Sequence, residues 1–558
     1  MDYHLKKMVF DDTASLQDAI ESCLAGAKKV GFCVDHKGKL LGMLTQGDLL
    51  RILKEGACFD APAINYINRN PVTISNKVTV KEAKKLIGNR IQLIPQLDED
   101  GKLVGLINLS STDYDFINIK DKKVLIVGLG YVGLTLALIL ADSGFSVNGY
   151  DINKDLVDTI NKKIPPFYEA GIEEYIGTHV GKRIRLLRTL DNNVADIFII
   201  TVGSPIDRET KEPITDNIVN AAKNVGRILS KDCLVMLRST VPVGSTRNLV
   251  IPELERQSGL RAGEDFFVAY CPERTTEGRA LEELRYLPQI VGGMDERSIE
   301  IASRLFNEYT STIVNVGTLE AAEFSKLIDN VYRDVKFAFA NQIAELAERL
   351  GLNVHQVIDA VNHHYMRNNI PKPSPGVGGP CLTKDTYILK DVFNKAGMEA
   401  PLLTASRIIN EQGPKNIVLR ADVALKSVGK GLKGARVFVV GFAFKGEPET
   451  SDLRDSTTLW FLDELKKCTT EIIGFDPVIQ HNDLATLDII ISDPEDGFLG
   501  ADAVFIMNNH KSYLKWDLPK YLRSLRKPAL FFDAWHLFQE NKFTDFPGIL
   551  YLSIGIGH

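Results

Sequence analysis

The chain is poor in cysteine, which argues against a scaffold held together by disulfides. Seven cysteines occur among 558 residues. None belongs to a C-x-x-C pair, so we expect neither a disulfide framework nor a structural zinc site. The odd number leaves room for one reactive thiol. The seven are Cys23, Cys33, Cys58, Cys233, Cys271, Cys381 and Cys468.

The chain also lacks an excess of positive charge. It has 66 Lys and Arg against 72 Asp and Glu, a formal net charge of −6. No general affinity for nucleic acid is therefore indicated, and an anionic ligand must meet a local cluster of cations. The opening residues, MDYHLKKMVFDD, contain no apolar run of signal-peptide length, so we expect a cytoplasmic protein.

Long hydrophobic runs are scarce, and the one that stands out is interrupted. Val124 to Ala141 carries no formal charge, a length at which a membrane span must be considered. Three glycines, Gly128, Gly130 and Gly133, break it. A strand, a glycine turn and a buried helix explain the run better than a membrane span does, so no membrane segment is expected.

The first fifth of the chain contains an internal repeat. Val30 to Leu53 and Ile94 to Asp113 each show an apolar strand, a D-x-x-G-K-L turn and a second strand. The turns are Asp35 to Lys39 and Asp98 to Lys102, and a helical pattern such as Val80 to Ile87 lies between the copies. A repeated unit of two strands and a helix is therefore predicted.

This repeat resembles a tandem CBS domain, a module that commonly binds adenosine nucleotides. In such modules an Asp after the second strand holds the ribose, and Asp48 in TQGDLL matches that position. The second copy has Ser111 there, so the resemblance implies at most one good adenine-nucleotide site per chain. The alternative is a dimerisation module without a ligand, because a fold does not establish binding.

Strands and helices alternate from Lys122 onward, which predicts a parallel sheet covered on both faces. The pattern turns helical near residue 318, and a second strand–helix series begins near Gly434. We predict an α/β protein with two Rossmann-like, doubly wound domains joined by a helical dimerisation segment and preceded by a small α+β pair. The expected domains are residues 1–119, 120–317, 318–412 and 413–558.

A glycine-rich turn gives the most specific local signal. Gly128, Gly130 and Gly133 form G-x-G-x-x-G after a strand and before a helix, and a second strand ends at Asp151. The glycines permit a tight turn, close approach of the backbone to a pyrophosphate, and helix–strand packing. Asp151 would accept hydrogen bonds from the ribose hydroxyls and repel a 2′-phosphate. The motif therefore predicts NAD rather than NADP.

A second unusual loop, PSPGVGGPCLTKD, carries Cys381. Its glycines and prolines suit close approach to a ligand, and a thiol at the start of a helix is favoured as thiolate. The alternative is a small core cysteine. A thiol beside a nicotinamide domain suggests oxidation of an alcohol through an aldehyde to an acid, by way of a thiohemiacetal and a thioester.

That chemistry needs a carboxylate near water and a cation near the oxyanion. Glu273 and Glu277 lie four residues apart, as do Lys326 and Asn330 on one helical face, and Thr240 closes a strand. Each of these residues also has an ordinary explanation as solvated surface.

Several motifs in one order resemble the UDP-glucose/GDP-mannose 6-dehydrogenase family over residues 121 to about 545. They are GLGYVG, STVPVGST, CPERTTEG, EFSKLIDN, GVGGPCLTKD, GFAFKGEPETSDLRDS and GFDP. The resemblance implies a catalytic set with Cys381 as nucleophile, Lys326 at the oxyanion, Asn330 and Asp385 holding water and substrate, and Glu273 as base. Glu277 and Thr240 complete the water network.

The resemblance also implies binding residues. The UDP-sugar would be bound by Lys445, Gly378, Gly379 and Arg367. The cofactor would be bound by Gly128, Gly130, Tyr131, Val132, Gly133, Asp151 and Arg454.

Two positions, Pro380 and Thr383, depart from the common pattern around the cysteine and could alter the loop shape. CPERTTEG, LPQIVGG and PSPGVGG resemble the subgroup that oxidises UDP-N-acetylhexosamines, so we expect UDP-N-acetylglucosamine or UDP-N-acetylmannosamine as substrate. UDP-glucose is the alternative, and an adenine-nucleotide sensor on a dehydrogenase-like scaffold is a third. An apolar stripe of Leu327, Val331, Val335, Ala338 and Ile343 must be buried. The family resemblance implies that it forms the core of a dimer, so we expect a homodimer or a dimer of dimers.

Overall fold

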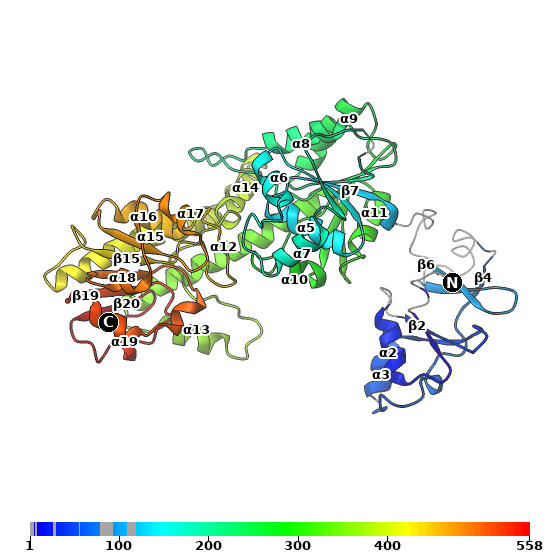
Figure 1. Ribbon diagram of the computed structural model, residues 1–558, viewed down its shortest axis with the longest axis horizontal. Helices are drawn as coiled ribbons and strands as arrows, with labels where there is room; N and C mark the ends of the chain where they lie inside the picture. The colour runs from blue at the N-terminus through cyan, green and yellow to red at the C-terminus, as the bar shows by residue number, and fades with distance from the viewer. Residues whose placement is uncertain are drawn as a thin grey trace. The chain divides into compact units, whose positions relative to one another are not determined.

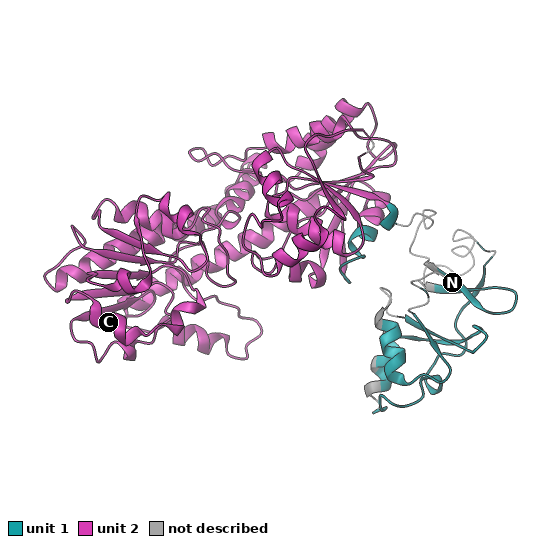
Figure 2. Cartoon of the chain, in the orientation of Figure 1, with its two compact units in different colours: residues 1–121, 303–311 teal, residues 122–302, 312–558 magenta. Residues whose placement is uncertain are grey.

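The computed structural model describes the chain except residues 1–4, 6–7, 26–29, 55, 77, 79–92, 109–118, 193 and 558. The helical pattern at Val80 to Ile87 and Ser111 therefore lie outside the described residues. The chain divides into two compact units (Figure 2). One is residues 1–121 with 303–311, and the other is residues 122–302 with 312–558.

The N-terminal unit shows the predicted repeat strand for strand. Two three-stranded sheets each contain one parallel pair followed by an antiparallel hairpin, with the register shift at the same place in both hairpins. Asp35 and Asp98 each accept the backbone N–H four residues on, at 2.9 and 2.8 Å, which fixes both turns. The strands are β1 (Val9–Asp11), β2 (Val30–Val34), β3 (Leu40–Thr45), β4 (Ile74–Ser75), β5 (Leu93–Leu97) and β6 (Leu103–Asn108), with helices α2 (Leu16–Ala25) and α3 (Gln46–Lys54).

The second unit begins with an eight-stranded sheet in the order β14-β13-β12-β11-β10-β7-β8-β9. Figure 1 labels strand β7 of this sheet. Strands β7 to β12 are parallel, whereas β13 and β14 run antiparallel to them. The central strands β10, β11 and β12 are fully buried apolar runs, as expected for a sheet covered on both faces, whereas β8 and β9 are only partly buried. The strands are β7 (Lys123–Val127), β8 (Ser146–Tyr150), β9 (Ile184–Leu187), β10 (Ile197–Ile200), β11 (Leu234–Leu237), β12 (Phe267–Tyr270), β13 (Gln289–Gly293) and β14 (Ile313–Thr318).

The helices of this first domain alternate with its strands. They are α5 (Tyr131–Asp142), α6 (Lys154–Asn161), α7 (Ile172–His179), α8 (Asp216–Gly226), α9 (Ile251–Ser258), α10 (Ala280–Tyr286) and α11 (Glu296–Phe306). Helix α5 is buried nearly all round, so the uncharged run that suggested a membrane span is a strand, a turn and a core helix. Among the described residues, no helix is long and apolar enough to cross a membrane.

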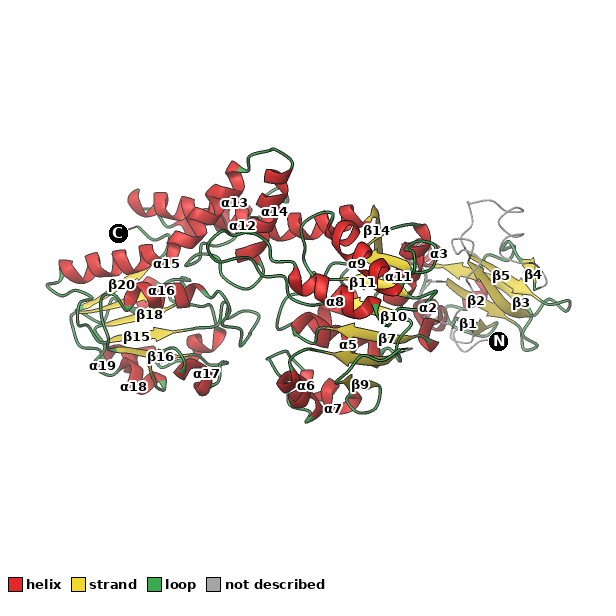
Figure 3. Cartoon of the chain, turned by 90° about the horizontal axis from the view of Figure 1, so that it is seen from above, coloured by secondary structure: helices red, strands yellow, loops and turns green. Residues whose placement is uncertain are grey.

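A six-stranded parallel sheet, ordered β17-β16-β15-β18-β19-β20, forms the C-terminal domain (Figure 3). Its core has an aliphatic and aromatic cluster on each face of the sheet. The strands are β15 (Val437–Val440), β16 (Ile472–Phe475), β17 (Ile490–Ile491), β18 (Ala503–Ile506), β19 (Ala529–Asp533) and β20 (Ile549–Ser553). The helices are α16 (Thr457–Leu465), α17 (His481–Ala485), α18 (Pro494–Phe498) and α19 (Leu518–Ser524).

Helices connect the two large sheets. They are α12 (Leu319–Arg349), α13 (Val354–Asn362), α14 (Leu382–Lys395) and α15 (Pro401–Ser427). The α/β class with two Rossmann-like sheets, a helical middle and a small N-terminal pair is thus confirmed. Helix α12 has 31 residues and packs against both α14 and α15. Helix α12 therefore runs from the first domain into the helical segment that leads to the second domain.

The apolar stripe predicted on this helix is largely covered within this chain, and the dimer stays a prediction. Leu327 and Val331 are buried, and Val335 packs beside them against α14 and the start of α15. A different face of α12 is exposed, carrying Phe324, Ile328, Tyr332, Phe339 and Leu346. The helix is apolar on both faces, and sequence periodicity could not tell which face the chain would cover.

Candidate active site

The glycine turn after β7 has the geometry of a dinucleotide-binding turn. Gly128 has φ of 99°, where a side chain would be strained. A Cβ on Gly133 would lie 1.8 Å from the carbonyl oxygen of Gly128, so only glycine permits this approach. A Cβ on Gly130, the N-cap of α5, would meet no atom within 4 Å, which leaves the helix N-terminus open to a phosphate. Tyr131 and Val132 form the first turn of α5.

Asp151 stands at the end of β8, next to that turn. One carboxylate oxygen accepts the N–H of Leu129 at 2.7 Å, and the other accepts the N–H of Asn153 at 2.8 Å. Both oxygens retain lone pairs for a ribose, beside a small cavity of about 110 Å³ that Asp151 lines with Lys154 and Arg188. The fold therefore brings Asp151 next to the glycine turn, as the sequence spacing predicted.

The second Rossmann-like domain has a similar glycine and acid with a different outcome. Gly441 has φ of 90°, and Asp476 follows β16. Asp476 is 4% exposed and accepts the backbone N–H groups of Phe442, Ala443 and Val478 within 3.0 Å. Its buried carboxylate is already hydrogen-bonded to the backbone, so it is not available to bind a ribose as Asp151 is.

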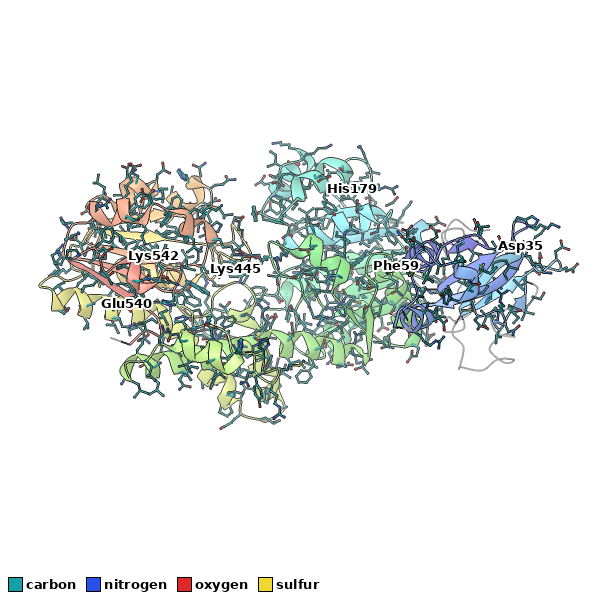
Figure 4. The ribbon with its side chains drawn as sticks, turned by 90° about the horizontal axis from the view of Figure 1, so that it is seen from below. Asp35, Phe59, His179, Lys445, Glu540 and Lys542 are labelled. Carbon is teal, nitrogen blue, oxygen red and sulfur yellow. The ribbon has the colours of Figure 1, made fainter. Side chains whose placement is uncertain are left out.

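A cleft of about 280 Å³ lies between the two large domains, within the second unit. Cys381 and the glycine loop form one wall, Thr275 to Glu277 another, and Lys445 a third. Figure 4 labels Lys445 where the C-terminal domain faces the first domain. The cleft brings together segments more than 100 residues apart, and three of the predicted motifs contribute to it.

Cys381 is the N-cap of helix α14, and its side chain is exposed within the cleft. The enclosing walls raise the pKa of the thiol, and the Asp385 carboxylate raises it further, while Lys326 and Lys384 oppose both effects. The expectation that the helix start would favour thiolate is therefore wrong for this state of the chain. An added cation, or loss of the Asp385 charge, would be needed to lower the pKa.

Two predicted residues on α12 are buried, and the charge of one of them, Lys326, acts on this thiol. Lys326 and Asn330 are 8% and 3% exposed. Asn330 donates from Nδ2 to Asp385 at 2.5 Å, and Lys384 donates from Nζ to the other oxygen of Asp385 at 2.7 Å. Asn330, one of the two residues predicted on this helical face, is therefore bonded directly to the predicted Asp385.

Glu273 is buried and strongly paired. Arg238 donates to it at 2.6 Å from Nη2 and 3.1 Å from Nε, and the N–H groups of Arg274 and Thr275 donate at 2.7 Å. Burial disfavours the charged form, but Arg238, the N–H of Thr275 and the charge of Lys326 outweigh it and lower the pKa of Glu273. An anion so well stabilised is a weak base.

Glu277 has the opposite environment. Burial and the nearby Asp452 raise its pKa to about 7, against the attraction of Arg454 and Lys445. Thr450 donates to its carboxylate at 3.3 Å, and Lys445 donates to its backbone carbonyl at 2.7 Å. Of the two predicted glutamates, Glu277 is the one poised to exchange a proton near neutrality.

The predicted Lys445 and Arg454 both border Glu277. Burial lowers the pKa of Lys445 to about 8, although Glu277 favours its charged form. Arg454 pairs with Asp452 at 2.5 Å and lies 3.8 Å from Glu277. The glycine loop packs on the same segment, since Gly379 donates to the carbonyl of Asp455 at 2.9 Å and a Cβ on Gly378 would lie 2.5 Å from that oxygen.

Several predicted residues do not line this cleft. They are Lys326, Asn330, Asp385, Glu273 and Arg454, together with Arg367, Thr240 and Asp48. Arg367 is exposed on the loop after α13, and its recorded contact is with the ring of Tyr365, 5.7 Å away. Thr240 accepts a hydrogen bond from Ser204 at its backbone carbonyl. Asp48 belongs to the N-terminal unit, where it accepts hydrogen bonds from the N–H and hydroxyl of Thr45, at 3.0 and 2.7 Å, in a helix-capping arrangement.

The structure adds residues that the sequence reasoning missed. Arg333 lines the cleft, and it lies three residues after Asn330, so helical spacing could have indicated it. Glu169 is buried, accepting a hydrogen bond from the Tyr131 hydroxyl and another from the N–H of Gly278 at 2.8 Å. This carboxylate joins the glycine turn to the loop of Glu277, and no local spacing predicts it. No metal-binding group of three or more His, Cys, Asp or Glu occurs in the described part of the chain.

A dinucleotide turn with a free acid, a thiol cleft and a second Rossmann-like domain define a nicotinamide-dependent dehydrogenase. Models of the UDP-glucose/GDP-mannose dehydrogenase family match three consecutive segments: the NAD binding domain at 122–310, the central domain at 320–412 and the UDP binding domain at 438–540. The chain belongs to this family and is a nucleotide-sugar dehydrogenase. A CBS domain model matches residues 2–55 and 63–111.

The curated relatives agree with this assignment. A UDP-N-acetyl-D-mannosamine dehydrogenase of Pyrococcus horikoshii is 31% identical over 439 residues, covering 78% of this chain and 99% of the relative. One of Campylobacter jejuni is 32% identical over 406 residues, covering 70% and 96%.

Solved structures agree as well. The UDP-D-ManNAc dehydrogenase of P. horikoshii has a TM-score of 0.70 at 30% identity, and a UDP-glucose dehydrogenase of Pyrobaculum islandicum has 0.70 at 26%. The coverage of this chain is 78% in both cases, and that of the solved chains is 99% and 98%.

Proposed function

We propose that this enzyme oxidises the C6 hydroxyl of a UDP-N-acetylhexosamine to the carboxylate, through an aldehyde, with Cys381 as covalent nucleophile. The observation that carries the proposal is the cleft lined by the Cys381 thiol, Glu277 and Lys445. Asp385, which is bonded to Asn330, and Lys326 both lie near enough to the thiol to influence its charge. NAD, held by the glycine turn and Asp151, would supply the hydride acceptor for both oxidations.

The other steps of the reaction are assigned to side chains of the site. The thiol of Cys381 adds to the aldehyde carbon, and the thiol proton leaves to a base as the C–S bond forms. Lys326 stabilises the oxyanion of the thiohemiacetal and, later, of the hydrolysing thioester. Asn330 and Asp385 hold water beside the sulfur. Water attack breaks the C–S bond, returns the thiol and releases the acid, with the proton passing to a carboxylate.

Two glutamates compete for the role of base in thioester hydrolysis. Glu273 was the expected base, and its ion pair with Arg238 favours a role in holding the loop instead. Glu277 borders the cleft with a pKa of about 7, which suits proton transfer near neutral pH. We therefore assign proton transfer to Glu277 and keep Glu273 as the alternative.

The relatives support an acetamido sugar as substrate. The named relatives at 31% and 32% identity are UDP-N-acetyl-D-mannosamine dehydrogenases. This agrees with CPERTTEG and PSPGVGG in this chain, and Lys445 and Arg333 supply the positive charge that a UDP diphosphate needs. UDP-N-acetylmannosamine is the preferred candidate and UDP-N-acetylglucosamine the second. UDP-glucose is the alternative outside this subgroup.

One experiment tests both chemistry and substrate. The purified enzyme is incubated with NAD and each of UDP-N-acetylmannosamine, UDP-N-acetylglucosamine and UDP-glucose. NADH is measured by absorbance and the uronate by chromatography. We expect two NADH per uronate with an acetamido sugar. One NADH per product, with aldehyde accumulating, would refute the thiol mechanism. Faster turnover of UDP-glucose than of either acetamido sugar would refute the assignment of a UDP-N-acetylhexosamine as substrate.

We further propose an adenine nucleotide as the ligand of the N-terminal pair and a homodimer or dimer of dimers as the assembly. The CBS match supports the first proposal, although Asp48 already caps its own helix. The exposed apolar face of α12, with Tyr332 63% exposed and Leu346 57% exposed, supports the second.

A further inference from the structure

A buried carboxylate lies one helical turn beyond the proposed catalytic pair on α12. Asp334 follows Asn330 by four residues, so both lie on the same face of the helix. Its side chain has no solvent exposure. A carboxylate buried to this degree requires charged and hydrogen-bonding partners, and each partner found here comes from another helix.

The first partners tie α12 to α14 and α15. Arg407, on α15, donates from NH1 to Oδ1 of Asp334 at 2.8 Å, which balances the charge. Thr386, on α14, donates its hydroxyl to Oδ2 at 2.9 Å. Thr386 directly follows Asp385, the residue bonded to Asn330. Two successive residues of α14 are therefore bonded to α12 at positions one turn apart.

A second set of bonds runs from Asp334 to the glycine loop. Asn410 donates from Nδ2 to Oδ1 of Asp334 at 2.8 Å, and Asn341 donates to the side-chain oxygen of Asn410 at 3.0 Å. Asn341 in turn accepts the N–H of Ser374, at the start of the loop, at 2.8 Å. The loop also packs closely here, because a Cβ on Gly376 would lie 2.2 Å from the carbonyl oxygen of Asn410. Both segments that flank Cys381 are thus linked to one carboxylate.

We infer that Asp334 and Thr386 are positioning residues, whose hydrogen bond sets the register of α14 against α12 and so places Cys381 and Asp385 against Lys326 and Asn330. The inference rests on the proposed thiol mechanism. Arg407 already balances the charge of Asp334, so the Thr386 hydroxyl is not needed for neutrality. Its contribution is geometric, since it stops α14 from sliding or rotating by a fraction of a turn.

The test replaces the hydroxyl without disturbing the ion pair. Thr386→Val is nearly isosteric and removes the donor, whereas Thr386→Ser keeps it. The matched control is Ser406→Ala, because Ser406 is also buried and faces the same oxygen of Asp334, at 3.5 Å, from α15 instead of α14. Each full-length variant is assayed for uronate formation, KM for the UDP-sugar, and the melting temperature.

We expect Thr386→Val to lower kcat for uronate formation about 10- to 100-fold, as small displacements of reacting groups do. KM should stay within about twofold, since uniform substrate binding is not affected. Thr386→Ser should restore kcat to within about threefold, and Ser406→Ala should leave it unchanged. A second measurement is the pH dependence of Cys381 alkylation by iodoacetamide, followed on its own peptide because Cys58 is also exposed. The pH dependence of this alkylation should shift in Thr386→Val but not in Thr386→Ser or Ser406→Ala.

Equal loss of kcat in Thr386→Val and Ser406→Ala, tracking the melting temperature, would overturn the inference in favour of a merely structural role. Unchanged kcat and alkylation in Thr386→Val would overturn it as well. If the wild-type enzyme forms uronate and Cys381→Ala does not, the proposed function stands whatever the Thr386 variants show. If Cys381→Ala still forms uronate, the proposed thiol mechanism is refuted. The pH dependence of Cys381 alkylation in wild type and Thr386→Val then still tests whether Thr386 sets the position of α14 against α12.

Discussion

Glu277 allows the clearest quantitative prediction, because burial and Asp452 raise its pKa from 4.5 to about 7. This shift means that ionising Glu277 in the folded protein costs roughly 3 kcal/mol more than in the unfolded chain. Replacing it by Gln removes that cost. The gain is absent below pH 4.5, where Glu277 is protonated in both states, grows as the pH rises, and is complete above pH 7.

The measurement is urea unfolding of wild type and Glu277→Gln at pH 5 and pH 8.5, compared by midpoint because a protein of several domains need not unfold in two states. We expect similar midpoints at pH 5 and a higher midpoint for the variant at pH 8.5. The control is Glu282→Gln, an exposed residue of the neighbouring helix α10, which should behave alike at both pH values.

The same substitution has a kinetic consequence. If Glu277 accepts a proton during turnover, wild-type kcat should rise with pH through an apparent pKa near 7, and the variant should lack that limb. A midpoint gain of equal size at both pH values would refute the electrostatic reasoning. An unchanged acidic limb in Glu277→Gln would refute the assignment of proton transfer and return Glu273 as the base.

The other predictions concern the thiol, the assembly and the N-terminal pair. Cys381→Ala should abolish uronate formation. Its NAD affinity, measured by calorimetry, should stay within about twofold of wild type, because the residues proposed to bind NAD lie on other elements than Cys381. Near-normal uronate formation by this variant would contradict the prediction. Tyr332→Glu should dissociate dimers in light scattering, whereas a wild-type monomer at micromolar concentration would contradict the exposed-face argument. AMP, ADP or ATP should bind the full chain and change KM or kcat, Asp48→Ala should weaken that binding, and removal of residues 1–119 should leave an active, unregulated enzyme. Absence of any calorimetric signal would leave an assembly or stability role for the repeat.

Several features could be predicted because their causes are local in sequence. The spacing of Gly128, Gly130 and Gly133 from Asp151 reflects one strand, one turn and one helix, whose dimensions are set by backbone geometry. The hairpins of the repeat follow from Asp and Gly at fixed turn positions, and the structure places them as predicted. Lys326 and Asn330 share a face because four residues make about one helical turn.

Other features depended on packing between distant segments. Thr386 meets Asp334 across 52 residues, and Asn410 meets it across 76, because three helices pack together. The exposure of one apolar face of α12 and the burial of the other were likewise decided by α14 and α15.

The ionisation of the site was also decided in three dimensions. A helix N-terminus alone favours thiolate at Cys381, but the surrounding walls and Asp385 reverse that preference. Glu273 and Glu277 are four residues apart in one loop, yet Arg238 lowers the pKa of the first, while burial and Asp452 raise that of the second. The chemical groups of the site, and the local turns and helices that hold them, follow from residue types and their spacing along the chain. Their protonation follows from the folded arrangement, because desolvation and charge proximity depend on neighbours that the linear order does not reveal.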